Sequence, residues 1–164
     1  MTITLKTGNL LDDDSEALTN AVNCIGVMGA GIALAFKNKF PEMFKQYQKD
    51  CQGGQYKVSV MNYWAFYDES MKKERFIINF PTMYYPGSTC TEDIIKDGMK
   101  DFRWLIEYLG IRSVAVPALG CGVGGLYWST VKPIIERSCL MGSSPASFNV
   151  NLYAPIGNYT NASL

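Results

Sequence analysis

Two glycine-rich segments, each between a strand pattern and a helical pattern, constrain the fold of this chain most strongly. The first, Gly26–Ile32, follows a short strand predicted at 17–23, and the second, Gly120–Gly125, follows a nearly all-apolar strand predicted at 113–117. Ligands of α/β sheets bind beyond the carboxyl ends of strands, so we expect the two segments to face one another. Glycines let backbone N–H groups approach an anion, and a helix N-terminus adds donors. The pair therefore suits a pyrophosphate, although either segment alone could be an ordinary turn.

The rest of the chain alternates strand and helix patterns. Further strands are predicted at 3–7, 58–66, 75–80 and 148–153, and helices at about 32–39, 41–51, 92–109 and 131–139. Thr91 has the chemistry of an N-cap and Gly110 of a helix stop, whereas Ser129 is the predicted N-cap of the last helix, with Pro133 in its first turn. This order, without repeats, predicts one three-layer α/β domain at 1–156 and a polar tail at 157–164.

Size and charge restrict the class of protein. The 164 residues suffice for one domain, and the 15 basic side chains equal the 15 acidic ones. No overall basic field exists to hold the chain on nucleic acid, so tight nonspecific binding is excluded. The sequence shows no signal peptide and no membrane span, so we expect a cytoplasmic protein. The acidic run 12–14 is expected to be a solvated loop or a helix start.

The residue types exclude several chemistries. The chain has no histidine, which removes Ser-His and Cys-His pairs and histidine metal ligands. Its five cysteines are scattered, without a CxxC pair, so we predict neither a metal site nor a disulfide framework. Cys121 lies between glycines, where a small residue that fills a tight turn is a better interpretation than a nucleophile.

Four motifs identify a resemblance. Neither glycine segment is a Walker motif or a GxGxxG dinucleotide fingerprint. Together, TGNLL (7–11), NAVN (20–23), GVMGAGIALAFKNKFP (26–41) and PALGCGVGGLYW (117–128) resemble the macrodomain, an ADP-ribose-binding module. The chain is similar to the branch of DNA ADP-ribosyl glycohydrolase antitoxins and terminal ADP-ribose glycohydrolases, and to ADP-ribose 1''-phosphate phosphatases. The resemblance implies an α/β/α fold with a mixed, roughly six-stranded sheet.

The resemblance also implies where ADP-ribose lies. Asn9 and Leu10 would lie at the adenine, Tyr153 would flank the adenine or its ribose, and Asn23 would contact the distal ribose and serve catalysis. Val27 and Met28 would be apolar walls of the distal-ribose pocket, or else core. The full predicted ligand-binding set is Gly8, Asn9, Leu10, Ala21, Val22, Gly26, Val27, Met28, Gly29, Ala30, Gly31, Ile32, Ala33, Gly120, Cys121, Gly122, Val123, Gly124, Gly125, Leu126 and Tyr153.

Two positions depart from the family pattern. The antitoxin branch has a catalytic lysine where this chain has Met83, and the terminal glycohydrolases have an aspartate where it has Gly124. A thioether neither forms a Schiff base nor donates a proton. Three hypotheses therefore remain: a hydrolase of an ADP-ribosyl derivative of a macromolecule or of ADP-ribose 1''-phosphate, a non-catalytic reader or nucleotide-sequestering module, and a regulatory domain for another nucleotide.

The expected partner is ADP-ribose or an ADP-ribosylated substrate, with no cofactor and no membrane. Nucleic acid enters only as a possible ADP-ribosylated substrate. A DNA-linked substrate would favour a local basic patch, for which the candidates are Lys37, Lys39, Lys45 and Lys49. The alternative for these lysines is a solvated helix face.

Overall fold

The computed structural model describes residues 2–140 and 148–155. Along the chain it contains β1 (Ile3–Lys6), a 3-10 helix (Leu10–Asp12), β2 (Ala17–Val22), α1 (Gly31–Lys39), α2 (Pro41–Gln52), β3 (Asn62–Asp68), β4 (Lys73–Pro81), α3 (Glu92–Leu109), β5 (Ser113–Val116), α4 (Trp128–Leu140) and β6 (Asn149–Tyr153). The tail predicted at 157–164 lies outside the described residues.

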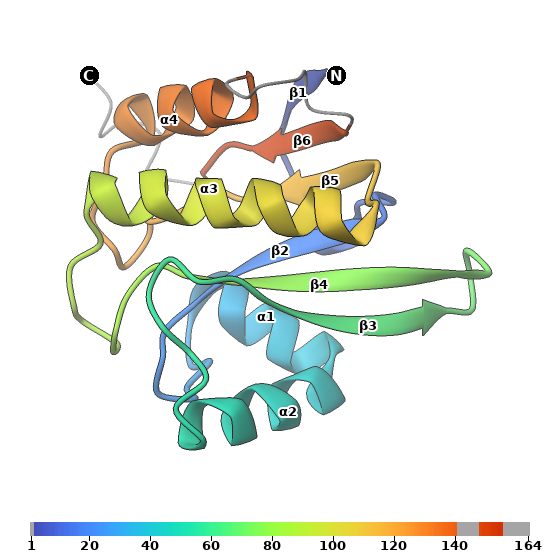
Figure 1. Ribbon diagram of the computed structural model, residues 1–164, viewed down its shortest axis with the longest axis horizontal. Helices are drawn as coiled ribbons and strands as arrows, with labels where there is room; N and C mark the ends of the chain where they lie inside the picture. The colour runs from blue at the N-terminus through green and yellow to red at the C-terminus, as the bar shows by residue number, and fades with distance from the viewer. Residues whose placement is uncertain (1, 141–147, 156–164) are drawn as a thin grey trace.

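The strands form one mixed six-stranded sheet in the order β1-β6-β5-β2-β4-β3. All neighbours are parallel except β3, which runs antiparallel to β4 at one edge. Helices α3 and α4 cover one face of the sheet, and α1 and α2 cover the other (Figure 1). The predicted three-layer α/β/α architecture with a mixed sheet is confirmed.

Each face of the sheet has its own apolar core. Phe80, Phe102 and Ile135 belong to the core under α3 and α4, and Phe36 and Met43 belong to the core under α1 and α2. The central strands are buried by both cores, which explains why β5 is almost entirely apolar. The two layers of helices leave the loops at the carboxyl ends of the strands as the place where a ligand can enter.

Helix ends follow the predicted chemistry in α3 but not in α4. The Thr91 side chain caps α3, and Gly110 ends it in the left-handed conformation, with φ of 68°. Helix α4 begins at Trp128, so Ser129 lies inside the helix and Pro133 lies beyond its first turn. The reason is that the Tyr127 carbonyl accepts the first bonds of the helix, from the N–H groups of Thr130 and Val131.

Strand β3 begins four residues later than predicted. The segment before it turns at Ser59, which has φ of 66°, and the Val60 N–H donates to Lys57 O. Residues far along the chain stabilise this turn, because Ser59 N donates to Pro81 O and Met61 N donates to the Asp101 carboxylate. These long-range contacts are why an apolar pattern alone misplaces the start of the strand.

The acidic run is not simply solvated, because Asp13 is buried. Its side chain is fully enclosed and accepts hydrogen bonds from Ser15, Asn151 and the Tyr153 hydroxyl. Asp12 and Asp14 are exposed, as expected. Among the described residues, no helix is long and apolar enough to cross a membrane.

Candidate functional site

A cleft of about 740 Å³ opens at the carboxyl ends of the parallel strands. Strands β2 and β5 are neighbours, so the glycine segments that follow them lie on the same cleft. The lining is Gly8, Asn9, Leu10, Leu11, Ala21, Val22, Asn23, Val27, Gly29, Ala30, Gly31, Ile32, Ala33, Ala35, Thr82, Met83, Pro86, Pro117, Ala118, Gly120, Cys121, Gly122, Val123, Gly124, Tyr153, Ala154 and Pro155. None of these lining residues carries a charge.

The first glycine segment leads into an uncapped helix. Ala30 is the N-cap residue of α1 and makes no side-chain capping bond, and the first turn contains no acidic residue. The N–H groups of residues 31–33 have no partner within the helix, and these residues line the cleft. The helix therefore presents free donors and the positive end of its dipole to the cleft, which suits an anion.

The second glycine segment offers further donors. Its turn is closed by bonds from Leu126 N to Gly120 O and from Gly125 N to Gly122 O. No described residue accepts a bond from the N–H groups of 122–124, which also line the cleft. Gly124 packs so closely that a Cβ there would lie 2.7 Å from Gly120 O. The cleft thus has backbone donors on two sides.

Asn23 directly follows β2 and borders the cleft. Its Oδ1 accepts bonds from Ile25 N (3.0 Å), Val27 N (3.4 Å) and the Tyr47 hydroxyl (2.8 Å), and its Nδ2 donates to Val27 O (2.7 Å). The carboxamide therefore shapes the first glycine segment as well as facing the cleft. Main-chain bonding between Cys24 N and Tyr84 O joins this segment to the loop after β4.

Asn9 and Tyr153 also line the cleft, and each is held by a hydrogen bond. The Asn9 side chain caps the 3-10 helix through a bond from Leu11 N. The Tyr153 hydroxyl donates to Asp13 Oδ2 at 2.7 Å. Burial alone would raise the pKa of Asp13, but hydrogen bonds from Ser15, Tyr153 and Asn151 outweigh it and lower that pKa. Asp13 therefore stays ionised and fixes Tyr153 against the cleft.

Cys121 is not an activated nucleophile. Its thiol is buried and lies 3.6 Å from Leu119 O, and burial, with Cys90 nearby, raises its pKa to about 12. A thiol that stays protonated fills the turn, which is the interpretation favoured by the sequence. Across 2–140 and 148–155, no three side chains of the types His, Cys, Asp or Glu group as metal ligands.

Four predicted residues lie outside the lining, whereas the other predicted residues belong to it. Met28 is 1% exposed and belongs to the core under α1 and α2, the alternative already open from the sequence. Gly26 has φ of 88° and packs against Gln48 and Cys51 of α2. Gly125 and Leu126 close the second turn instead of facing the cleft.

Sequence reasoning missed the part of the cleft that follows β4. Thr82, Met83 and Pro86 line it, and Met83 is half-buried there. The signal that could have found them is the position of FIINFPT, because a parallel strand next to 17–23 must end at the same edge. In the sequence, Met83 stands out only because the antitoxin branch has a catalytic lysine at this position.

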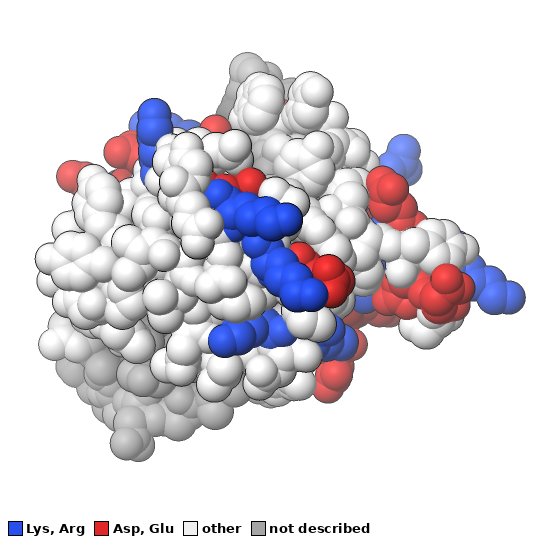
Figure 2. Space-filling view, turned by 90° about the horizontal axis from the view of Figure 1, so that it is seen from below, with Lys and Arg blue, Asp and Glu red and all other residues white. Residues whose placement is uncertain are grey.

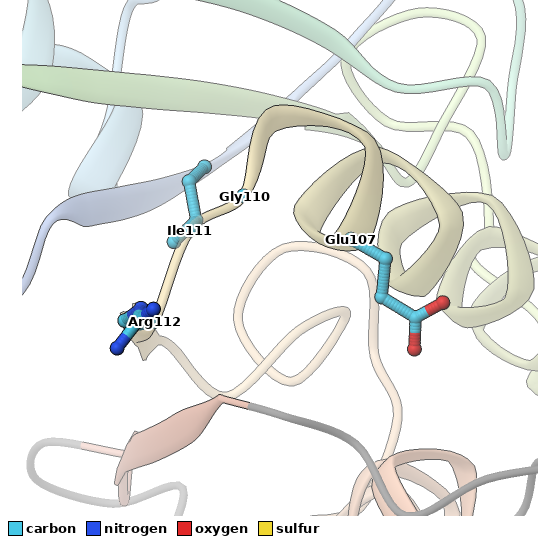
Figure 3. A pocket seen from close by; sticks show the side chains of 4 residues that line it. All are labelled: Glu107, Gly110, Ile111 and Arg112. Atoms are coloured by element: carbon cyan, nitrogen blue, oxygen red, sulfur yellow. The ribbon is translucent and has the colours of Figure 1, made fainter.

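A second hollow lies away from this cleft, at the turn between α3 and β5. Figure 3 shows its lining residues, Glu107, Gly110, Ile111 and Arg112. The hollow has a volume of about 380 Å³. It lies before β5 begins, whereas the cleft lies beyond the carboxyl end of β5. The Glu107 carboxylate already pairs with Arg103 at 3.0 Å.

Comparisons with known proteins agree with this geometry. The Macro domain family matches residues 19–135. A DNA ADP-ribosyl glycohydrolase of Thermus aquaticus is 37% identical over 151 residues, which cover 92% of this chain and 41% of that protein. The chain thus spans about two fifths of the length of this curated relative.

Two solved structures share the fold closely. The macrodomain of Mycobacterium tuberculosis DarG superposes with a TM-score of 0.87 at 39% identity, covering 94% of this chain and 98% of that one. Thermosipho africanus DarTG in complex with ADP-ribose gives a TM-score of 0.84 at 28% identity, covering 94% of this chain and 42% of that one. On the family match and these similarities, the chain belongs to the macro domain family.

Proposed function

We propose that this macrodomain binds ADP-ribose in its cleft and releases it by hydrolysis from an ADP-ribosylated macromolecule. The observation that carries the proposal is the uncharged cleft with unpaired N–H donors at residues 31–33 and 122–124. Two sets of donors match two phosphates, and no acidic side chain is among the lining residues. The pyrophosphate would lie between the glycine segments.

In this arrangement Asn23 would hold the distal ribose. A water molecule attacks C1'' of that ribose, the bond from C1'' to the macromolecule breaks, and the leaving group takes the proton. Among the residues that line the cleft, only Cys121 and Tyr153 have ionisable side chains, and burial raises the pKa of both. The protein would therefore act by positioning the water and the ribose, and not through a strong base. Positioning alone can supply a large part of a rate enhancement.

ADP-ribosylated DNA is the substrate that we favour. The support is that the similar protein of Thermus aquaticus is a DNA ADP-ribosyl glycohydrolase, and that the fold is similar to the DarG and DarTG structures. We also propose a cytoplasmic location, in keeping with five free cysteines, none of them bridged.

Three of the four candidate lysines of α1 and α2 make contacts within the protein. Figure 2 shows basic side chains in a band on the face that these helices cover, with acidic side chains beside it. Lys39 donates to Leu11 O, Lys45 pairs with Glu42 and Lys37 lies 4.5 Å from the Phe44 ring centroid. Of these three contacts only that of Lys45 is with a carboxylate, so the band remains a candidate surface for the DNA of such a substrate.

The test is a turnover assay with ADP-ribose affinity measured by calorimetry on the same protein. ADP-ribosylated DNA, ADP-ribosylated protein and ADP-ribose 1''-phosphate serve as parallel substrates. We expect product from the DNA substrate, and its loss in Asn23→Ala. Product from a different substrate would identify that substrate in place of DNA. If the protein does not bind ADP-ribose, the proposal is overturned.

A non-catalytic reader is the second candidate, and Met83 is the observation that favours it. Met83 lines the cleft where the antitoxin branch has its lysine, so the cleft can hold ADP-ribose without an amine. Tight binding with no release from any of the three substrates would establish the reader.

A further inference from the structure

The hydroxyl of Tyr47 meets Asn23 from the buried side of the site. Tyr47 lies in α2 and is 1% exposed. Its hydroxyl oxygen is 2.9 Å from Asn23 O and 2.8 Å from Asn23 Oδ1. The single phenolic proton is shared between a main-chain and a side-chain oxygen of one residue, so the contact fixes both.

The remaining bonds of Asn23 fix the orientation of its carboxamide. The N–H groups of Ile25 and Val27 donate to the same Oδ1, and Nδ2 donates to Val27 O. Only the amide nitrogen can donate to a carbonyl, so oxygen and nitrogen are assigned without ambiguity. No described residue accepts the second Nδ2 proton, and Asn23 lines the cleft. That proton is left for a ligand.

The position of Tyr47 is set by the core and not by the cleft. Its ring packs edge-on against Tyr56 at 4.9 Å between centroids. The next residue, Gln48, donates from Nε2 to Gly26 O at 3.3 Å, so two adjacent residues of α2 hold Asn23 and the start of the first glycine segment. Burial raises the pKa of the Tyr47 hydroxyl, which therefore remains a neutral donor.

We propose that Tyr47 is a positioning residue, whose buried hydroxyl holds the Asn23 carboxamide in the orientation that leaves one Nδ2 proton for the distal ribose of bound ADP-ribose. This rests on the proposed function. Without the hydroxyl, Asn23 Oδ1 loses its shortest hydrogen bond. Oδ1 then accepts bonds only from the N–H groups of Ile25 and Val27, in the same loop. A site held by a rigid supporting shell loses precision when that shell is removed.

Tyr47→Phe tests this role, and Tyr56→Phe is its matched control. Tyr56 is also buried, and its hydroxyl accepts a bond from Asn79 Nδ2 at 3.0 Å, but it makes no hydrogen bond to Asn23. Both variants keep the aromatic ring and lose one buried hydroxyl. We expect similar shifts of the urea midpoint in both, but a loss of ADP-ribose affinity, or of kcat where turnover is present, of about tenfold or more only in Tyr47→Phe.

A double variant separates positioning from any direct effect. Tyr47 acts through Asn23, so Tyr47→Phe added to Asn23→Ala should change ADP-ribose affinity by less than about twofold. A tenfold further loss in that background would overturn the inference, and so would equal affinity and turnover in Tyr47→Phe and Tyr56→Phe. A wild-type protein that binds no ADP-ribose would overturn the proposed function and, with it, the role of Tyr47.

Discussion

Asp13 connects two ends of the chain at the side of the cleft. Its carboxylate accepts bonds from Asn151 and Tyr153, both in the last strand, and lies 3.7 Å from Lys6 in the first strand. Buried hydrogen bonds to a charged acceptor contribute more than neutral ones. Asp13 therefore stabilises the fold and orients a cleft residue at the same time.

Asp13→Asn is expected to lower the free energy of unfolding by about 2 kcal/mol at neutral pH. The folded-state pKa of Asp13 is lowered from its ordinary 3.8, so this stabilisation is present above that value and is lost as the pH falls toward the folded-state pKa. Urea unfolding from about pH 6 to about pH 3 should show the difference between wild type and variant shrink. Asp12→Asn, at an exposed neighbour, is the control and should change stability by less than about 0.5 kcal/mol. A difference that grows toward low pH would contradict this.

Met83→Lys should accelerate the proposed hydrolysis. Residue 83 lines the cleft and is half-buried, so a lysine there can place its amine in the site. A positioned acid or base typically contributes about 10²–10⁴-fold to a rate. We expect release of ADP-ribose from DNA to increase at least about tenfold, measured under single-turnover conditions. Met83→Leu is the control of similar volume, and an equal increase in both variants would rule out the amine.

Sequence reasoning at this scale succeeds for residues with local roles. The Thr91 cap and the Gly110 stop were predicted because caps depend on near neighbours, whereas most residues of the cleft lining were named through the resemblance to the macrodomain. The sequence predicts a solvated loop or a helix start at 12–14 and does not reveal that Asp13 is buried, because its partners Asn151 and Tyr153 lie about 140 positions away. The Tyr47 contact with Asn23 spans 24 positions and has no pattern that could reveal it.

At the scale of elements, the second glycine segment divides into positions that keep the fold and positions that face the ligand. A Cβ at Gly124 would lie 2.7 Å from Gly120 O and 2.9 Å from Cys90 Cβ. A Cβ at Gly122 would have no atom within 4 Å. The aspartate of the terminal glycohydrolases therefore cannot be introduced at 124 without moving the loop.

Gly122→Val should abolish ADP-ribose binding while it changes stability by less than about 0.5 kcal/mol, because the new side chain extends into open space beside the cleft. Gly124→Ala should instead cost about 1–3 kcal/mol of stability through overpacking. Calorimetry and urea unfolding on both variants test whether Gly122 serves binding and Gly124 serves stability. Unchanged affinity in Gly122→Val would remove the second segment from the binding site.

Elements were predicted well where a local signal defines them. Strand β5 and helices α2 and α3 stand within a residue of their predicted bounds. Strand β3 and helix α4 were misplaced, because the turn at Ser59 is held by Pro81 and Asp101, and because α4 takes its first bonds from Tyr127. Such boundaries depend on contacts that exist only in the folded chain.

At the scale of the whole molecule, ADP-ribose should stabilise the domain by mass action. A ligand at 100 times its Kd adds about 2.7 kcal/mol, which for a domain of this size raises Tm by about 5–10 °C. Thermal unfolding with and without ADP-ribose measures the shift, and Gly122→Val supplies the matched protein that should show none. ADP, which lacks the distal ribose, should give a smaller shift at the same concentration. Equal shifts with ADP would remove Asn23 from recognition.

The uncapped start of α1 gives this binding a local signature. Helix α3 receives its cap from Thr91, whereas α1 begins with donors that no side chain of its N-cap satisfies. A phosphate in the cleft would accept hydrogen bonds from the first turn of α1, as the Thr91 side chain does for α3. The bound ligand would then be the N-terminal cap of α1. Amide hydrogen exchange at residues 31–33 would then be fast in the free protein and slow in the complex, and the first turn of α1 would report occupancy of the cleft directly.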